Sequence, residues 1–288
     1  MDLSLVIPTY NERENIQNLL FEIKKEFKKN NIKGEVIVVD DNSPDGTSKL
    51  VEELSKKEKF VKLIKRNGKS GLSSAVLAGF EKASSDVLAV MDADLSHPAE
   101  KIGEMYKAIK CDDSDLVIGS RYIKGGNIKG WNLYRKILSK GATLLARVFT
   151  DIKDPMTGFF MIKKKCIEGV ELNSRGFKIL LEIIIKANYK KTKEIPITFT
   201  NRIKGKSKAG INEILYYLHD LKGYLFKEKK VILEFFKFAF VGLVGTFINI
   251  IILYLLTEIA GVYYMISAVF AFIVAATNNF FLNKIFTF

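Results

Sequence analysis

Two long segments without a charged residue constrain the fold of this chain more than any other feature. Residues 238–257 and 262–282 are 20 and 21 residues long. A helix rises about 1.5 Å per residue, so either segment can cross the roughly 30 Å hydrocarbon layer of a bilayer. Because only the short turn at residues 258–261 separates them, we expect a hairpin of two membrane-spanning helices. The alternative is a pair of buried helices in a soluble core.

The lysines near this hairpin lie only at its two outer ends and not in its turn. They precede the first segment and follow the second, and the connecting turn has none. Positively charged flanks stay on the cytoplasmic side. We therefore expect a multi-pass protein whose preceding domain and both termini are cytoplasmic. Gly242, Gly245 and Asn249 on the first segment, with Asn278 and Asn279 on the second, are typical of close helix packing. They could equally mark an interface through which the chain forms an oligomer.

The rest of the chain is strongly basic. The formal net charge is +13, and from Phe235 onward only Lys237, Glu258 and Lys284 are charged. Such an excess is typical of proteins that bind an anionic membrane surface, an acidic substrate or nucleic acid. We find no nucleic-acid-binding module and no basic stripe with stacking aromatic residues. We therefore expect a lipid bilayer as a partner and no nucleic acid.

Cysteine and histidine are too rare to support several kinds of site. Cys111 and Cys166 have no close spacing, and His97 and His219 are the only histidines. This pattern predicts neither a disulfide framework nor a zinc motif. Two histidines also argue against a histidine-based metal site and against a Ser-His-Asp hydrolase.

Residues 1–120 alternate between short apolar runs and amphipathic stretches. The apolar runs are residues 3–7, 35–40, 61–64, 86–92 and 115–118, and the amphipathic stretches are 14–29, 47–57, 72–83 and 98–110. Alternating strands and helices predict an α/β fold with a mostly parallel, Rossmann-like sheet that helices cover on both faces. Ligands of such sheets bind beyond the carboxyl ends of the strands.

Chemically rich residues follow these predicted strands. Tyr10 and Glu12 follow the first, Asp40 ends the second, and Arg121 follows the fifth. A carboxylate at the end of the second strand can accept hydrogen bonds from the base or ribose of a nucleotide. The plainer interpretation of residues 42–47 is a turn followed by a helix N-cap.

Asp92 and Asp94 follow the fourth predicted strand. Residues two apart in an extended segment point the same way, so both carboxylates can approach one divalent cation. Mg²⁺ and Mn²⁺ prefer oxygen ligands and stabilise the charge of a departing nucleoside diphosphate. An isolated Asp-x-Asp is also compatible with a solvated turn. The acidic and polar residues at the neighbouring strand ends favour the metal site.

The remaining segments carry basic and amphipathic patterns. Residues 131–140 place Arg135, Lys136 and Lys140 among apolar residues, as a solvated helix face or as a phosphate site would. Residues 211–226 read as an amphipathic helix that lies in the membrane interface. We therefore divide the chain into a globular domain at 1–210, interfacial helices at 211–234 and a membrane hairpin at 235–288.

Six ordered phrases resemble glycosyltransferase family 2, and within it the dolichol-phosphate mannose synthases, which are polyprenyl-phosphate glycosyltransferases. They are residues 7–15, 39–47, 91–98, 119–126, 154–160 and 176–180, and the likeness covers residues 1–210. The hairpin resembles the first half of a GtrA-like membrane domain in residues 237–242 and 279–284. The resemblance implies a GT-A type catalytic domain.

The resemblance also implies roles for particular residues. Those that would hold the donor nucleotide are Pro8, Tyr10, Glu12, Asp40, Asp92 and Arg202. Asp92, Asp94 and Arg202 would be catalytic, with both aspartates at the metal and Arg202 in a loop that closes over the donor phosphates. Ser96 stands where some relatives have a glutamine ligand to the metal, and a water would bridge this shorter side chain. Residues that match the acceptor phosphate site are Arg121, Arg135 and Ser139.

Together these observations predict transfer of mannose from GDP-mannose to dolichyl or another polyprenyl phosphate, with Mg²⁺ or Mn²⁺. The acceptor phosphate is already ionised, so no strong general base is needed, and positioning with electrostatic stabilisation supplies the catalysis. One displacement gives a β-linked product, dolichyl β-D-mannosyl phosphate, and GDP. Three alternatives stay open: a UDP-glucose donor, a transferase with a hydroxyl acceptor, and a non-catalytic membrane adaptor or lipid-carrier transporter.

Overall fold

The computed structural model describes residues 1–68, 71–172, 178–201 and 229–287. The chain forms two compact units, residues 1–218 and residues 219–288. The interfacial helix predicted at 211–226 lies outside the described residues, as does Arg202.

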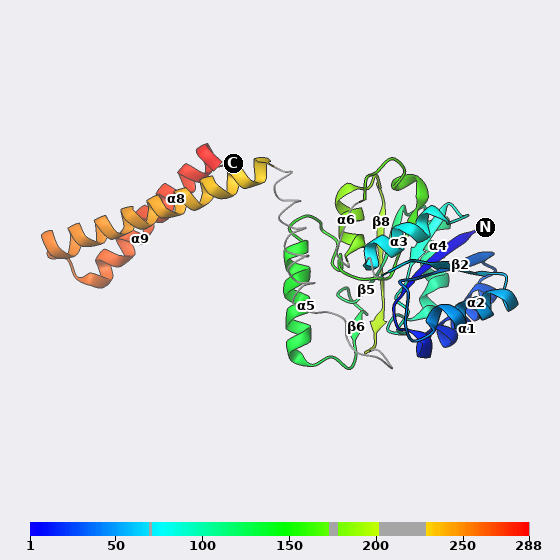
Figure 1. Cartoon of the computed structure of the whole chain (residues 1–288). Helices are drawn as coiled ribbons and strands as arrows, with labels where there is room; N and C mark the ends of the chain where they lie inside the picture. The colour runs from blue at the N-terminus through cyan, green and yellow to red at the C-terminus, as the bar shows by residue number, and fades with distance from the viewer. Residues whose placement is uncertain (69–70, 173–177, 202–228, 288) are drawn as a thin grey trace. The chain divides into compact units, whose positions relative to one another are not determined.

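A seven-stranded sheet forms the centre of the first unit, as Figure 1 shows. The strands are β1 (Leu3–Thr9), β2 (Gly34–Asp40), β3 (Val61–Lys65), β4 (Val87–Val90), β5 (Leu116–Ser120), β7 (Phe160–Lys163) and β8 (Thr192–Pro196). Their order is β3-β2-β1-β4-β7-β5-β8, and only β7 runs antiparallel to its neighbours. The mostly parallel sheet expected from the sequence is confirmed. The reversed strand β7 was not predicted.

Helices cover both faces of the sheet because side chains alternate along each strand. On β1, Leu5 and Ile7 pack with the helices α1 (Arg13–Lys29), α2 (Thr47–Lys57) and α4 (Ile102–Lys110). Val6, between them, packs with α3 (Leu72–Glu81) and α6 (Ile179–Lys186) on the opposite face. Two short 3₁₀ turns, η1 (Ala99–Lys101) and η2 (Lys164–Cys166), complete these layers.

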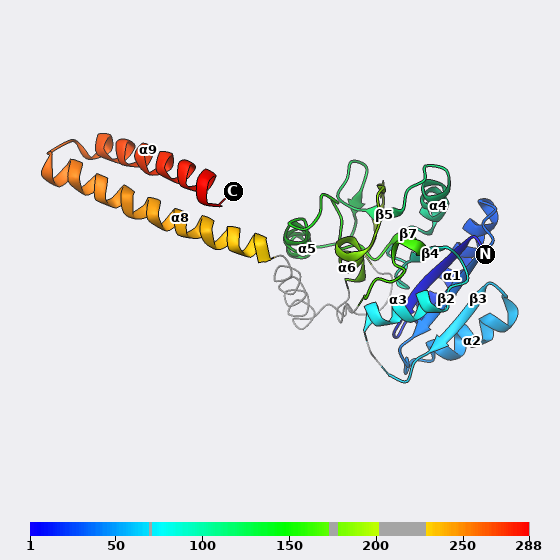
Figure 2. The same ribbon diagram turned by 90° about the horizontal axis from the view of Figure 1, so that it is seen from above.

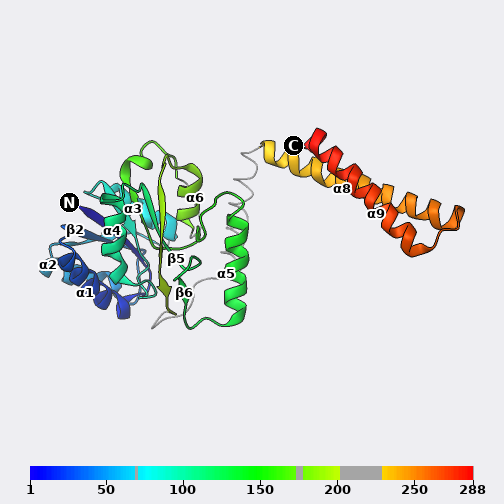
Figure 3. The ribbon, with the colours of Figure 1, turned by 180° about the vertical axis from the view of Figure 1, so that it is seen from behind.

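A smaller substructure lies beside the sheet and carries several candidate residues. The strands β6 (Asn127–Ile128) and β9 (Thr198–Phe199) pair in parallel. Helix α5 (Leu133–Ala146) stands alongside β6 in Figures 1 and 3. It begins at Asn132, whose side chain accepts a hydrogen bond from the Arg135 backbone N–H at 2.9 Å. Such an N-cap satisfies one of the donors that a helix end leaves unpaired.

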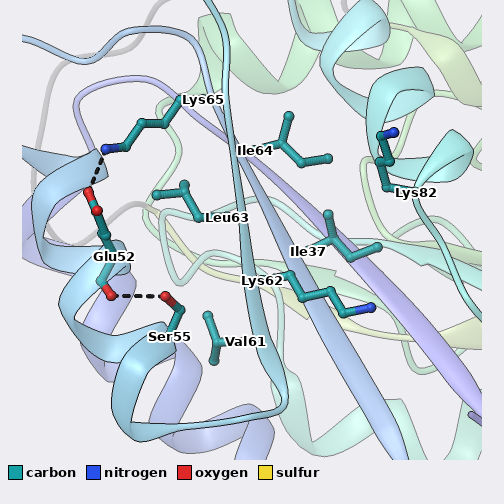
Figure 4. Close-up of a pocket in the computed structure, with 9 residues that line it drawn as sticks. All are labelled: Ile37, Glu52, Ser55, Val61, Lys62, Leu63, Ile64, Lys65 and Lys82. Atoms are coloured by element: carbon teal, nitrogen blue, oxygen red, sulfur yellow. Dashed lines mark hydrogen bonds and ion pairs between the residues drawn. The ribbon is translucent and has the colours of Figure 1, made fainter.

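Strand β3 forms one edge of the sheet and carries Lys62 and Lys65. Lys62 pairs with the buried Glu35 at 2.6 Å, and Lys65 pairs with Glu52 at 2.5 Å. Figure 4 shows these lysines around a shallow depression between β3 and α2. Charged side chains on an edge strand oppose pairing with a second chain. The depression runs along the whole of β3 and contains none of the residues expected at the active site, so we assign no candidate site to it.

The second unit is a helical hairpin, and Figure 2 shows its two helices side by side. Helix α8 (Lys229–Tyr254) continues into a π-helical turn, η3 (Leu255–Ile259), and α9 (Tyr264–Leu282) continues into a second, η4 (Asn283–Thr287). The spans Glu234–Ile259 and Tyr264–Thr287 are long and apolar enough to cross a membrane. A β-carbon on Gly245 would lie 2.2 Å from the Asn279 Oδ1, so this glycine permits the predicted close contact between the helices.

Two glycines test how tightly the first unit is packed. A β-carbon on Gly79 in α3 would lie 2.4 Å from Val6 Cγ1, whereas one on Gly141 in α5 would meet nothing within 4 Å. We expect Gly79→Ala to lower the free energy of unfolding by about 1–3 kcal/mol, because α3 must move away from β1. Gly141→Ala should raise it by up to about 1 kcal/mol, because alanine favours the helix.

Thermal unfolding of the full chain in detergent, followed by fluorescence of the single tryptophan, measures both effects. Equal effects of the two substitutions would contradict the packing of α3 on β1.

Candidate active site

The acidic residues after β4 lie in a tight turn. The Asp94 carboxylate accepts hydrogen bonds from the Ser96 backbone N–H, at 3.1 Å, and from the Ser96 hydroxyl. Leu95 has a φ of 61°, a left-handed conformation that is rare and strained for a bulky residue. The extended segment expected at Asp92–Asp94 was therefore wrong, because β4 ends at Val90. The side chains are oriented by the turn and not by strand alternation.

The backbone N–H of Asp92 forms a hydrogen bond, and Gly158 leaves space beside its carboxylate. Its N–H donates to His97 Nδ1 at 3.3 Å, and its side chain is 31% exposed. A β-carbon on Gly158 would lie 2.7 Å from the Asp92 Oδ1. Only glycine at position 158 therefore leaves space for this carboxylate, which keeps it accessible beside the acidic turn.

His97 is buried between two aromatic rings. Its ring stacks on Phe159 at a centroid distance of 5.4 Å and meets the edge of Phe199 at 5.2 Å. Burial lowers the pKa of His97, and the nearby Asp92 and Asp94 carboxylates only partly oppose this effect. Because Nδ1 accepts the Asp92 N–H, the neutral ring carries its proton on Nε2.

The residues expected to bind the nucleotide lie at the carboxyl ends of β1 and β2. Asp40 is fully buried, and its carboxylate accepts from the Thr9 hydroxyl at 2.9 Å and from the Ser43 backbone N–H at 2.9 Å. The hydroxyls of Ser43 and Ser48 also donate to it. A carboxylate has about four acceptor positions, and Asp40 uses them to join the end of β1, the loop after β2 and the start of α2.

The loop after β1 is tied to the same region. Pro8 lies near the end of β1, and Tyr10 and Glu12 follow it. The Glu12 backbone N–H donates to the Thr47 hydroxyl at 3.1 Å, at the start of α2. The Glu12 carboxylate accepts from the Asn15 amide at 2.9 Å. The structure therefore brings Pro8, Tyr10, Glu12 and Asp40 to one edge of the sheet.

Arg121 forms a buried, two-pronged ion pair with Asp154. The Arg121 Nε and Nη2 atoms donate to the two carboxylate oxygens at 2.7 and 2.8 Å. Burial opposes the charge of Arg121, but Asp154 outweighs it and raises the arginine pKa. Glu194 accepts from the backbone N–H groups of Lys153 and Asp154 and so fixes the loop that carries Asp154.

Arg135 and Ser139 lie one turn apart on the inner face of α5. The guanidinium of Arg135 covers the Trp131 ring at 4.2 Å and donates to the Asn201 side chain at 3.2 Å. The Ser139 hydroxyl and the Tyr122 hydroxyl are 2.8 Å apart. The Trp131 indole N–H is buried and has no hydrogen-bond partner in the described part of the chain.

One ring joins the acidic turn to these basic residues. Phe199 contacts His97, lies 5.4 Å from Trp131 and lies 5.6 Å from the Arg121 guanidinium. The Thr200 backbone N–H, next along the chain, donates to the Ser96 carbonyl at 3.0 Å. The structure thus brings Asp92, Asp94, Ser96 and Arg121 around a shared aromatic cluster of Phe159, His97, Phe199 and Trp131.

Sequence reasoning assigned no role to several residues that build this arrangement. Asp154 and Gly158 stand in a phrase that the sequence analysis noted, so their position there was the available signal. His97 also stands in such a phrase, at 91–98, but no role was assigned to it. Glu194 and Phe199 belong to no motif, so only the folded structure shows which residues they contact.

The burial of His97 predicts a pH effect. Its pKa in the folded state lies below the ordinary value of 6.5. As pH falls below about 7, the His97 imidazole binds a proton in the unfolded chain, whereas in the folded chain it stays neutral until a lower pH. The free energy of unfolding should therefore decrease through this window and level off below the folded pKa.

Imidazole ¹⁵N NMR measures the charge of His97 directly. The chain has two histidines, and His97→Asn identifies the signals of His97. We expect these signals to report the neutral Nε2–H form at neutral pH and a titration below the ordinary pKa of 6.5, and a pKa above 6.5 would contradict the burial described.

Comparisons with known proteins identify the family. The sequence profile described as glycosyl transferase family 2 matches residues 4–170, and the profile described as GtrA/DPMS, transmembrane domain, matches residues 237–288. A dolichol-phosphate mannosyltransferase from Pyrococcus furiosus is 46% identical, over all of this chain and 81% of the relative. A protein of the same name from Saccharomyces cerevisiae is 38% identical, over 79% of this chain and 88% of the relative.

Solved structures share the fold. A mannosyltransferase from Pyrobaculum calidifontis, in complex with GDP-mannose and Mn²⁺, matches with a TM-score of 0.53 at 17% identity, over 71% of this chain and 58% of that one. Glucosyl-3-phosphoglycerate synthase from Mycobacterium tuberculosis, with Mn²⁺ and UDP, matches with a TM-score of 0.54 at 15% identity, over 78% and 79% of the two chains. The chain belongs to glycosyl transferase family 2 and is a membrane glycosyltransferase.

Proposed function

We propose that this protein transfers mannose from GDP-mannose to a polyprenyl phosphate such as dolichyl phosphate, with inversion at the anomeric carbon. Full-length relatives named for the transfer of mannose to dolichol phosphate support the acceptor and the sugar. A structural neighbour in complex with GDP-mannose supports the donor. The observation that carries the proposal is the aromatic cluster of Phe159, His97, Phe199 and Trp131. Its rings link the acidic turn to Arg121 and Arg135.

The donor nucleoside would lie against the loops that follow β1 and β2. Pro8, Tyr10 and Glu12 line one loop, and Asp40 anchors the other. Because protein donors occupy the Asp40 carboxylate, a ribose hydroxyl could bond to it only by displacing a serine hydroxyl. Asp40 would therefore act mainly by fixing the loop that receives the nucleoside.

The acidic turn fits a divalent metal ion, Mg²⁺ or Mn²⁺. Gly158 leaves space that a β-carbon would fill next to the Asp92 carboxylate, and Asp94 is oriented by Ser96. Among the described residues no group of three or more His, Cys, Asp or Glu side chains could hold a metal. Two carboxylates suit an ion whose other ligands are diphosphate oxygens and water. When bound, the ion would neutralise charge on the departing diphosphate.

Ser96 would act through Asp94. Its hydroxyl already donates to the Asp94 carboxylate, and partners of this kind set the orientation of a metal ligand. This arrangement favours an orienting role over direct coordination of the metal.

The acceptor phosphate would bind near Arg121, Arg135 and Ser139. Asp154 occupies two donors of Arg121, so this arginine offers its remaining N–H groups to a phosphate. The buried indole N–H of Trp131, between the two arginines, is a further donor for the same anion. Buried donors without partners are rare, and a ligand oxygen would satisfy this one.

The chemistry is a single displacement. An acceptor phosphate oxygen forms a bond to the anomeric carbon as the bond to the GDP oxygen breaks, and GDP leaves with the electron pair. The phosphate is already an anion, so no side chain has to remove a proton. Asp92, Asp94 and Arg202 would position the donor and stabilise the charge that develops.

The membrane part of the proposal follows the basic flanks of the hairpin. The catalytic domain at 1–210, the interfacial segment at 211–234 and both termini would be cytoplasmic, with the hairpin at 235–288 in the bilayer. The apolar, largely exposed surfaces of the two spans support this placement.

The transfer assay separates the candidate donors. Purified full-length protein with Mn²⁺, a polyprenyl phosphate and radiolabelled GDP-mannose should move label into the organic phase, and EDTA should abolish the transfer. Asp94→Ala should lower the rate by more than about 100-fold, since even the partners that orient metal ligands are worth about 10–100-fold. Asp151→Ala, at an exposed position, is the matched control and should leave the rate unchanged.

Transfer from UDP-glucose alone would change the donor and keep the acceptor and the mechanism. A sugar hydroxyl as the only working acceptor would refute the phosphate acceptor. No transfer from either donor by the folded protein would favour a membrane adaptor.

Gly158→Ala tests the space beside Asp92. The added methyl group would displace the Asp92 carboxylate, and we expect Mn²⁺ affinity in the presence of GDP to fall by about 10–100-fold. Titration of Mn²⁺ followed by electron paramagnetic resonance measures this affinity. Gly141→Ala, whose methyl group meets nothing, is the control. Unchanged Mn²⁺ binding by Gly158→Ala would remove Asp92 from the metal site.

A further inference from the structure

A second candidate site lies along helix α5. A groove of about 700 Å³ runs beside the helix, between it and the loop that follows β5. From α5 it is lined by Lys136, Lys140, Thr143 and Arg147, and Lys153 is among the residues that face them. The proposed function gives no role to these five residues.

The groove is strongly basic. Arg121, Lys136, Lys140, Arg147 and Lys153 all line it, and no aspartate or glutamate does. Arg121 is neutralised by Asp154. In the described part of the chain the other four cations have no ion-pair partner. Four uncompensated cations in one concave surface favour an anionic ligand.

Thr143 supplies the second, independent observation. It is only 5% exposed, and its hydroxyl has no hydrogen-bond partner in the described residues. A buried hydroxyl without a partner destabilises the folded state, because it has lost its hydrogen bonds to water. A ligand oxygen in the groove would satisfy it, so this residue points to an occupant that carries hydrogen-bond acceptors.

The rim of the groove is apolar and exposed. Leu133, Ile137 and Leu144 line it with exposed fractions of 74%, 60% and 66%. A helix with exposed apolar side chains beside basic ones is typical of a lipid–water interface. The occupant therefore combines a negative headgroup with apolar chains.

This groove shares Arg121 with the proposed acceptor site, and the cations that α5 contributes to it come from a different stripe of the helix. Arg135 and Ser139 face Trp131, Asn201 and Tyr122, and neither lines the groove. Lys136, Lys140, Thr143 and Arg147 form the neighbouring stripe of the helix, spaced by three, four or seven residues. The two stripes are neighbouring faces of α5 that contact different residues.

We propose that the groove along α5 binds the phosphate headgroup of an anionic bilayer phospholipid, which remains bound and does not react. The chain carries two helices able to span a membrane, so such lipids are always present near it. Lys136, Lys140 and Arg147 hold the phosphate, Thr143 donates to it, and the apolar rim contacts the acyl chains. This proposal is independent of the donor sugar and of the transfer reaction.

Thermal unfolding measures the binding without any activity. Full-length protein in a neutral detergent is titrated with dihexanoyl phosphatidylglycerol, and Trp131 fluorescence follows unfolding. A ligand of the folded state raises the unfolding temperature with its concentration. We expect a saturable increase that dihexanoyl phosphatidylcholine does not produce.

Matched variants assign the effect to the groove. The triple variant Lys136→Gln/Lys140→Gln/Arg147→Gln should need at least about tenfold more phosphatidylglycerol for the same increase. The control Lys28→Gln/Lys57→Gln/Lys110→Gln removes the same charge from exposed positions elsewhere on the first unit and should respond as the wild type does. An equal loss in both variants would mean that net charge alone attracts the lipid, and would overturn the proposal.

Thr143→Val distinguishes a ligand donor from a structural threonine. Without lipid, its unfolding temperature should equal or exceed that of the wild type, because the unsatisfied hydroxyl is gone. Its affinity for phosphatidylglycerol should fall several-fold, and Thr143→Ser should retain it. A variant that binds lipid normally would remove Thr143 from the site.

Two further measurements distinguish other sources of phosphate. If inorganic phosphate gives the same increase at the same concentration, the groove binds a free anion and not a lipid. If the triple variant raises the KM for polyprenyl phosphate about tenfold in phosphatidylglycerol-free detergent, the groove belongs to the acceptor. Either result would overturn the proposal, and an unchanged KM with weakened phosphatidylglycerol binding supports it.

Discussion

The buried ion pair between Arg121 and Asp154 is the interaction on which the candidate site depends. It joins the end of β5 to the loop before β7, and the removal of one partner from such a pair costs about 3–5 kcal/mol. Arg121 in turn lies against the rings of Tyr122, Trp131 and Phe199. Tyr122 contacts Ser139 on α5, and Phe199 contacts His97 beside the acidic turn. A single pair of charges thus fixes the position of both α5 and the aromatic cluster.

The sequence predicted the framework of this arrangement because its signals are local. Alternating strand and helix patterns place Asp40, Asp92 and Arg121 at strand ends, and the structure has them there. The reversed strand β7 lies in an irregular segment, and its direction depends on pairing with β4 and β5 far away in the sequence. The positive φ of Leu95 and the hydrogen bond from Thr9 on β1 to Asp40 are further features of the folded chain. Patterns of hydrophobicity carry no information about them.

Negative and positive side chains occupy different parts of the first unit. In the proposed function Asp92 and Asp94 hold a cation beside the diphosphate, and Arg121 and Arg135 are linked to them through Phe199 and Trp131. Lys136, Lys140 and Arg147 add positive charge along the neighbouring stripe of α5, where apolar side chains accompany them. Electrostatic attraction to a bilayer and recognition of a reacting phosphate can then be separate properties of one helix.

The ring of Phe199 has a consequence for how such an enzyme can evolve. It contacts His97 on one side and Trp131 on the other, so in the proposed function a substitution that moves this ring would affect both the donor surface and the surface for the lipid carrier. Contacting residues contribute non-additively, so improvements on the two sides would not simply combine. A change of donor in this lineage would need compensating changes around the carrier, and the two specificities would be inherited together.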